Sequence, residues 1–193
     1  MQYSSIVLAA SSLLALISAY PTATPVELAP RCGTTDYAVT IQPIDSALPD
    51  TSFPPTNYFN LLQSGGSATT SGGRNMDALV AINGIPNGAY GCQLQVSFPA
   101  GYPVIGQGST QVNVFTLQAP FNSATTWNTT PAVASLWGTA TFTSGGTAII
   151  NSETCAPNLY FAFEIADDTA DGSVAFTQLG LPNPAGIQLT YNC

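Results

Sequence analysis

The feature that most constrains the fold is a strict alternation of apolar and other residues along several segments. In residues 92–98, 159–165 and 187–193, every second residue is apolar or cysteine, and those between are mostly polar. A period of two is typical of a half-buried strand, because successive side chains of a strand point to opposite faces. Three strands are therefore expected at these positions.

Turn signals divide the rest of the chain into similar short segments. Dipeptides such as Asn83-Gly84, Asn87-Gly88, Gly145-Gly146 and Asp171-Gly172 favour tight turns. Only residues 57–64, NYFNLLQS, are ambiguous between a strand and a helix. The sequence predicts an all-β fold, an antiparallel β-sandwich of immunoglobulin or jelly-roll type. Further strands are expected at 36–44, 77–82, 111–118, 134–143, 146–151 and 172–178.

The N-terminus predicts export. Residues 6–19 form an apolar run that is short for a membrane span and ends in small residues before Tyr20-Pro21, which is typical of a signal peptide cleaved after Ala19. The run lacks the usual basic residues before it, so a buried N-terminal helix is the alternative. We expect a signal peptide at 1–19, a Pro-rich leader at 20–31 and a single domain at 32–193, secreted to the cell exterior or wall and without a membrane anchor.

The four cysteines suit an exported chain. An even number in an oxidising compartment favours two disulfides over a metal site, since no two cysteines have metal-ligand spacing and no histidine is present. Of the three possible connectivities, we predict the nested one, Cys92–Cys155 inside Cys32–Cys193. The strand phases support it, because Cys92 and Cys193 share faces with apolar residues, and Cys155 precedes the Phe-rich strand expected opposite Cys92.

The charge composition excludes several functions. The chain has two arginines, no lysine, no histidine and ten acidic residues, for a net charge of −8. This balance argues against partners such as nucleic acid or anionic lipid. Histidine- and lysine-dependent catalysis is unavailable, which leaves a carboxylate pair of the glycosidase kind. No cofactor or metal is expected.

Few carboxylates are available for such a pair. The candidates are Glu153, Glu164 and Asp77, together with an acidic segment at 167–172. Asp and Gly favour turns, so this segment, which contains Asp167, Asp168 and Asp171, is interpreted as a turn rather than a calcium loop or a catalytic site. We expect no enzymatic activity.

The segment ATTWNTTPAV, residues 124–133, combines a rare tryptophan with a glycosylation pattern. Asn128-Thr129-Thr130 predicts an N-glycan on Asn128 in a secreted chain, although Pro131 lowers the expected occupancy. Trp127 is a candidate ligand contact, because its ring face suits a sugar. The favoured interpretation is that Trp127 closes one end of the sandwich core where the segment turns.

Seven stretches carry a family resemblance. They are GIPNGAYGCQLQVSFPAGYPV, TQVNVF, TTWNTTPA, SLWGTATF, INSETC, DDTADGSVAFTQ and LTYNC. In combination they resemble a fungal secreted family labelled ubiquitin-3-binding protein, But-two C-terminal domain, over about Cys32 to Cys193. The resemblance implies a small β-sandwich with cysteines at strand ends and supplies no catalytic residues.

The family label also implies binding to a subunit of an enzyme that activates a ubiquitin-like protein, which is an intracellular partner. A secreted chain would not meet that intracellular partner, so the family label is a better guide to the fold than to the function. The favoured hypothesis is a secreted, non-catalytic binding module for a wall polysaccharide or a cell-surface protein. A structural component of the cell wall, the intracellular partner of the label and a carboxylate glycosidase are the alternatives.

Overall fold

The alternating segments form strands in the computed structural model, which describes residues 33–37, 39–65, 73–167 and 169–192. All strand pairs are antiparallel, and the only helical element in these ranges is the 3-10 turn η1, Trp127–Thr129. The all-β prediction is confirmed. The strands are β1 Thr34–Asp36, β2 Val39–Asp45, β3 Tyr58–Ser64, β4 Arg74–Asn83, β5 Cys92–Ser97, β6 Ile105–Gly108, β7 Gln111–Leu117, β8 Val133–Thr141, β9 Thr147–Glu153, β10 Asn158–Ile165, β11 Gly172–Thr177 and β12 Gly186–Tyr191.

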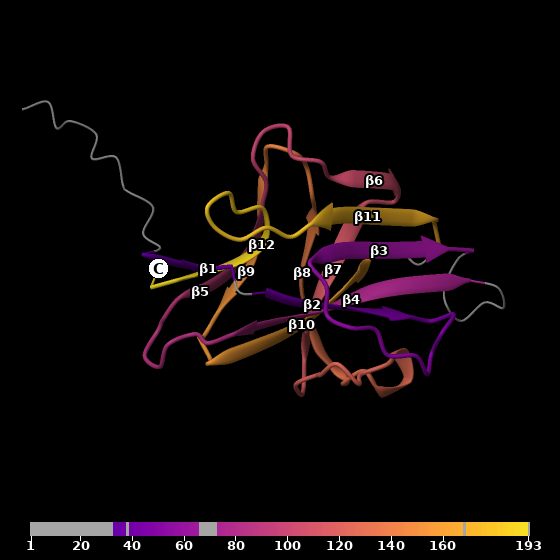
Figure 1. Cartoon of the computed structure of the whole chain (residues 1–193), viewed down its shortest axis with the longest axis horizontal. Helices are drawn as coiled ribbons and strands as arrows, with labels where there is room; N and C mark the ends of the chain where they lie inside the picture. The colour runs from indigo at the N-terminus through magenta and orange to yellow at the C-terminus, as the bar shows by residue number, and fades with distance from the viewer. Residues whose placement is uncertain (1–32, 38, 66–72, 168, 193) are drawn as a thin grey trace, which may run out of the picture.

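The strands form two sheets. One has four strands in the order β1-β12-β5-β9, and the other has the order β6-β11-β3-β4-β10-β7-β8, with β2 also paired to β4. In Figure 1, β6, β11, β3 and β4 lie one below another on the right, and the labels of the four-stranded sheet gather on the left. No helix in the described residues is long and apolar enough to cross a membrane.

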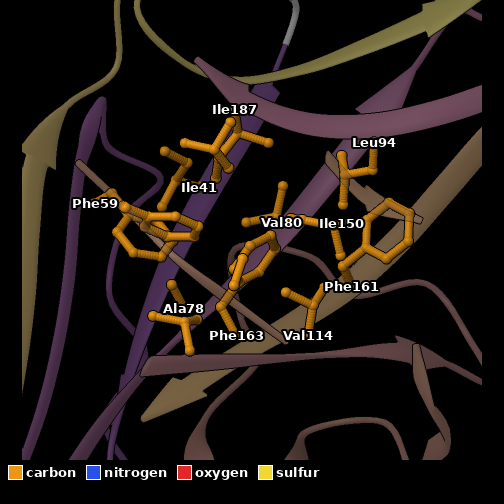
Figure 2. Packing of buried hydrophobic residues seen from close by; sticks show 14 of the residues in the cluster. Ile41, Phe59, Ala78, Val80, Leu94, Val114, Ile150, Phe161, Phe163 and Ile187 are labelled. Atoms are coloured by element: carbon orange, nitrogen blue, oxygen red, sulfur yellow. The ribbon is translucent and has the colours of Figure 1, made fainter. Parts of the chain in front are cut away.

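One hydrophobic core joins the two sheets. Leu94 and Ile187 of the four-stranded sheet belong to the same buried cluster as Val80 and Phe161 of the larger sheet (Figure 2). Phe59 on β3 is fully buried, and its ring contacts those of Phe142, Phe163 and Phe176 at centroid distances of 6.1, 5.5 and 4.6 Å.

The ambiguous segment at 57–64 is strand β3. Its burial alternates, with Phe59, Leu61 and Gln63 buried and the residues between them more exposed. Pairing with β11 over residues 58–63 supplies the hydrogen-bonding partner that a surface helix would lack. The Leu-Leu pair, which made the periodicity ambiguous, places Leu61 in the core and Leu62 on the other face.

A long connection covers the outer face of the larger sheet. β4 is buried on both faces from Ala78 to Ile82, unlike a strand with one solvated face. On the neighbouring strand, the fully buried Gln42 donates a hydrogen bond from Nε2 to the carbonyl oxygen of Thr125, at 2.9 Å. The segment between β7 and β8 therefore packs on this face.

The two sheets come together where β8 passes β9. A Cβ atom at Gly138 would lie only 2.7 Å from the carbonyl oxygen of Ile150, so only glycine fits this approach. Beside it, Nδ2 of Asn151 donates to the carbonyl oxygen of Trp137 at 2.6 Å. These contacts connect an end strand of one sheet to an end strand of the other.

The disulfide between Cys92 and Cys155 is present, with the two Cα atoms 5.1 Å apart, and Cys92 is fully buried. The predicted pairing is confirmed, and Cys92 shares one core cluster with Phe161 and Phe163 of the Phe-rich strand. Residue Glu153 of β9 lies directly opposite Cys92, whereas the Phe-rich strand β10 belongs to the other sheet. Cys32 and Cys193 lie outside the described residues.

A buried ion pair holds the start of β4. Asp45 is 1% exposed, and the guanidinium of Arg74 contacts its carboxylate, with Nη2 2.6 Å from Oδ2 and Nε 3.1 Å from the same oxygen. This hydrogen bond raises the pKa of Arg74 further above its ordinary value. Arg74 therefore ties the start of β4 to the end of β2.

Candidate functional site

The segment around Trp127 turns a corner, as the sequence analysis favoured. Within η1, the backbone N–H of Thr126 donates to Oγ1 of Thr129 at 2.8 Å. The exposed Asn128 donates from its backbone to the carbonyl oxygen of Pro49 and from Nδ2 to the carboxylate of Asp50, at 3.1 and 2.8 Å. The turn is thus attached to the loop after β2.

Asn128 and Trp127 differ in what they present to a ligand. The amide of Asn128 is at the surface, as an N-glycan requires, although attachment would replace one hydrogen of the group that contacts Asp50. Trp127 is half-buried and is not among the partly buried residues that pack against the main core. Glycosylation and a ligand contact at these positions both stay predictions.

The candidate carboxylates lie on different sheets. Asp77 is on β4 and Glu164 on β10, two strands that pair in the larger sheet. Glu153 lies at the end of β9 in the four-stranded sheet. The residue that sequence reasoning grouped with them is therefore separated from the pair.

The acidic segment after β10 is a turn. The carboxylate of Asp167 accepts hydrogen bonds from the backbone N–H and hydroxyl of Thr169, at 2.9 and 2.8 Å, which lowers the pKa of this carboxyl. The carboxylate of Asp171 accepts from the backbone N–H of Gly65 at 2.8 Å. Asp168 lies outside the described residues. In the part of the chain described, no three His, Cys, Asp or Glu side chains are grouped to hold a metal ion.

A hollow at the end of β9 combines features that the other predicted sites lack. It has a volume of about 340 Å³, and we call it the Tyr90–Glu153 hollow. Tyr90 contributes a side chain that is 61% exposed, and Glu153 contributes a half-buried carboxyl group. The lining residues are Ala89, Tyr90, Gly91, Ser152, Glu153, Thr154 and Cys155.

The disulfide holds the two sides of this hollow together. Cys92 follows Gly91 on one side, and its disulfide partner Cys155 belongs to the other side. Gly91 has a φ of 59°, a left-handed conformation that glycine adopts without strain. The carbonyl oxygen of Tyr90 accepts a hydrogen bond from the backbone N–H of Asn192 at 2.7 Å. The backbone is therefore held at Tyr90 and at Cys92, on either side of Gly91.

Glu153 lacks an internal partner for one of its oxygens. Its Oε1 is buried and makes no hydrogen bond to the described residues. Burial raises the pKa of this carboxyl above its ordinary value. Of the two basic residues in the sequence, Arg74 is paired with Asp45, and Arg31 lies outside the described residues. The hollow thus presents an unsatisfied acceptor with no cation among its lining residues.

Sequence reasoning named Glu153 but missed Tyr90. A single tyrosine in a Gly-containing turn carries no periodicity or motif. The predicted Cys92–Cys155 disulfide was the available signal, because it brings residues 90–92 and 153–155 together whatever the strand order. The predicted disulfide alone would therefore have placed Tyr90 near Glu153.

The chain matches the model of a known family. Residues 38–182 match the family model described as Ubiquitin 3 binding protein But2 C-terminal domain. A search of curated proteins found no match.

Proposed function

Because the chain belongs to the But2 C-terminal domain family, we propose that it is an exported, non-catalytic binding module. The observation that carries the proposal is the Tyr90–Glu153 hollow, where a disulfide holds an exposed aromatic residue beside a carboxyl oxygen without a partner. Groups held in place before a ligand arrives lower the entropic cost of binding. The ligand classes considered are a wall polysaccharide and a cell-surface protein.

Export is supported by two independent features. The apolar run at 6–19 has the profile of a signal peptide, and the Cys92–Cys155 disulfide suits an oxidising compartment. In the family description, the named partner is Ubiquitin 3. An exported chain would not meet a partner inside its own cell, so we take the binding role from the family and not the partner.

The fold that we propose is a β-sandwich with a second disulfide. The register of β1 and β12 pairs Thr34 with Tyr191 and Asp36 with Leu189. In the sequence, Cys32 stands two residues before Thr34 and Cys193 two residues after Tyr191, so the second disulfide that we propose would close the end of this strand pair. Directly opposed residues of an antiparallel pair have Cα atoms about 4.5–5.5 Å apart, which suits a disulfide.

The proposed absence of catalysis rests on the side chains that the chain has. It has no histidine or lysine, and the cysteines at 92 and 155 are paired. Of the acids considered for a glycosidase pair, Glu153 lies on a different sheet from Asp77 and Glu164. We therefore assign Glu153 to binding.

The test is expression of the full chain in a eukaryotic secretory host. We expect secreted protein that begins at Tyr20, contains no free thiol, and sediments with intact cells or with insoluble wall polysaccharide. A Cys92→Ser, Cys155→Ser variant is the control for nonspecific adsorption, because it lacks the disulfide that holds the two sides of the hollow together. The chain staying inside the cell would refute export, and a native chain that sediments with neither material would refute the binding role. Release of reducing sugar that Glu153→Gln abolishes would show an enzyme instead.

A further inference from the structure

The hollow beside β9 holds a carboxyl oxygen that nothing in the described chain satisfies. Oε1 of Glu153 is buried and has no hydrogen-bond partner. A buried acceptor without a donor costs free energy, and a charged acceptor costs more. The charge of the Glu153 carboxylate is therefore less well compensated than that of a fully hydrated one, which favours a cation beside it.

The chain has few groups of its own to supply that donor as a cation. It contains no lysine or histidine and only two arginines, and Arg74 is bound to Asp45. With ten acids against these two bases, the whole molecule attracts positively charged partners. A cationic group from outside fits both the hollow and the field around it.

We propose that the Tyr90–Glu153 hollow is a docking site for a lysine or arginine side chain of a protein partner. This inference rests on the proposed binding function and names the class of its ligand. The ammonium or guanidinium group donates to the carboxylate of Glu153 in a charge-assisted hydrogen bond. The exposed ring of Tyr90 offers a face for a cation–π contact.

The size and position of the hollow favour a side chain of a protein over a larger ligand. Its volume of about 340 Å³ is at the small end of ligand sites, which range over about 300–1,000 Å³. It is lined by Ser152, Glu153 and Thr154, at the end of β9, which is the last strand of its sheet. Because β8 lies against β9 at Ile150 and Asn151, an extended peptide segment can approach only the end of β9 at Ser152 and Glu153.

The first experiment is a nuclear magnetic resonance titration of the mature chain, residues 20–193, with four blocked peptides. They have the sequence Gly-Ser-X-Ser-Gly, where X is Lys, Arg, Gln or Glu. We expect the Lys and Arg peptides to shift the amide signals of Gly91, Ser152 and Thr154, and the Gln and Glu peptides to leave them unchanged. Raising the salt concentration should weaken the effect.

Matched variants separate the site from the general charge of the molecule. Glu153→Gln should weaken binding of the Lys peptide by at least about tenfold, the range expected when a charged hydrogen bond is lost. Asp50→Asn removes the same charge from an exposed loop and should leave the affinity within about twofold. Tyr90→Phe should bind as the native chain does, and Tyr90→Leu about threefold more weakly. Melting curves of each variant show whether a loss of binding comes from unfolding.

Several results would overturn this inference. Equal weakening by Asp50→Asn and Glu153→Gln would mean that only net charge matters. Equal binding of the Gln peptide would mean that the hollow does not select a cation. Shifts at these amides with glucosamine or glucose oligomers, and none with the Lys peptide, would assign the hollow to a glycan.

The two proposals can also fail separately. If the Lys peptide causes no shifts but the mature chain still sediments with cells, this inference fails and the proposed binding module remains. If the Lys peptide binds but the chain sediments with neither cells nor polysaccharide, the site stands and the proposed surface target is wrong.

Discussion

Replacing Arg74 by methionine should destabilise the chain, because it leaves a buried carboxylate without its cation. Asp45 is 1% exposed, and without Arg74 its Oδ1 would keep a hydrogen bond from the backbone N–H of Ala47, at 2.9 Å. Methionine retains an apolar stem, so the change removes mainly the charge and its donors.

The magnitude lies between two limits. Breaking a fully buried ion pair costs about 3–5 kcal/mol, whereas an exposed pair contributes at most about 1 kcal/mol. Here the carboxylate is buried, but the side chain of Arg74 is 46% exposed, so water enters readily once it is removed. We expect a loss of about 2 kcal/mol in the free energy of unfolding, or about 4–8 °C in Tm for a domain of this size.

The assay is urea unfolding with the disulfide intact, followed by tryptophan fluorescence. Trp137, which stacks on Phe161 with ring centroids 5.0 Å apart, reports on the core. Arg74→Lys keeps the charge but loses the two-nitrogen contact, so its loss should be intermediate. A double-mutant cycle with Asp45→Asn should give a coupling energy of about 2 kcal/mol. A loss below about 0.5 kcal/mol, or a coupling near zero, would refute the reasoning and class this pair with ordinary surface ion pairs.

Four further predictions test the core, the disulfide, the hollow and the corner. Burial raises the pKa of Glu153 above the ordinary 4.5, so between the unfolded and the folded pKa the folded chain holds a proton that the unfolded chain has released, and stability falls as the pH rises. At a pH above the folded pKa, Glu153→Gln should therefore melt at a higher temperature than the native chain. Tm values that are equal at pH 4 and pH 7 for both chains would contradict this. Replacing both Cys92 and Cys155 by alanine should cost about 4 kcal/mol relative to the oxidised native chain, since the bridge closes 63 residues. Chemical denaturation checks this, and the reduced native chain should unfold close to the variant. Phe59→Leu should cost about 1–2 kcal/mol and Phe59→Ala about 3–5 kcal/mol in the same assay, because this ring is fully buried among three others; equal losses would argue against the packing. Asn128→Gln should remove any enzyme-releasable glycan mass from secreted protein, and a retained glycan would place it elsewhere.

Local alternation was enough to predict most strands, because each strand with one buried face has an apolar residue at every second position. It failed where that condition does not hold. β6, with the sequence IGQG and all four residues exposed, is a short end strand held by backbone pairing to β11, so it carries no hydrophobic pattern. β4 is buried on both faces, and the connection between β7 and β8, distant in the sequence, contacts Gln42 of the paired strand β2.

The candidate site was predictable only in part. Cysteine count and compartment gave the Cys92–Cys155 bridge, and the list of acids gave Glu153. What makes Glu153 distinctive is one buried oxygen without a donor, and this depends on side-chain packing that no spacing encodes. Tyr90 acquires its role only from the fold around it.

The position of β4 has a consequence for hydrogen exchange. This strand pairs with β2, β3 and β10 and is buried on both faces over Ala78–Ile82, so its amides reach solvent only when the whole sheet opens. End strands open more readily, and β9, whose last residues line the hollow, is one of them. A partner that docks there would slow exchange at Ser152 and Thr154 through local protection. At β4, exchange would slow only as far as binding stabilises the entire domain against unfolding. The exchange rates at β9 and at β4 together therefore separate local protection from stabilisation of the whole domain.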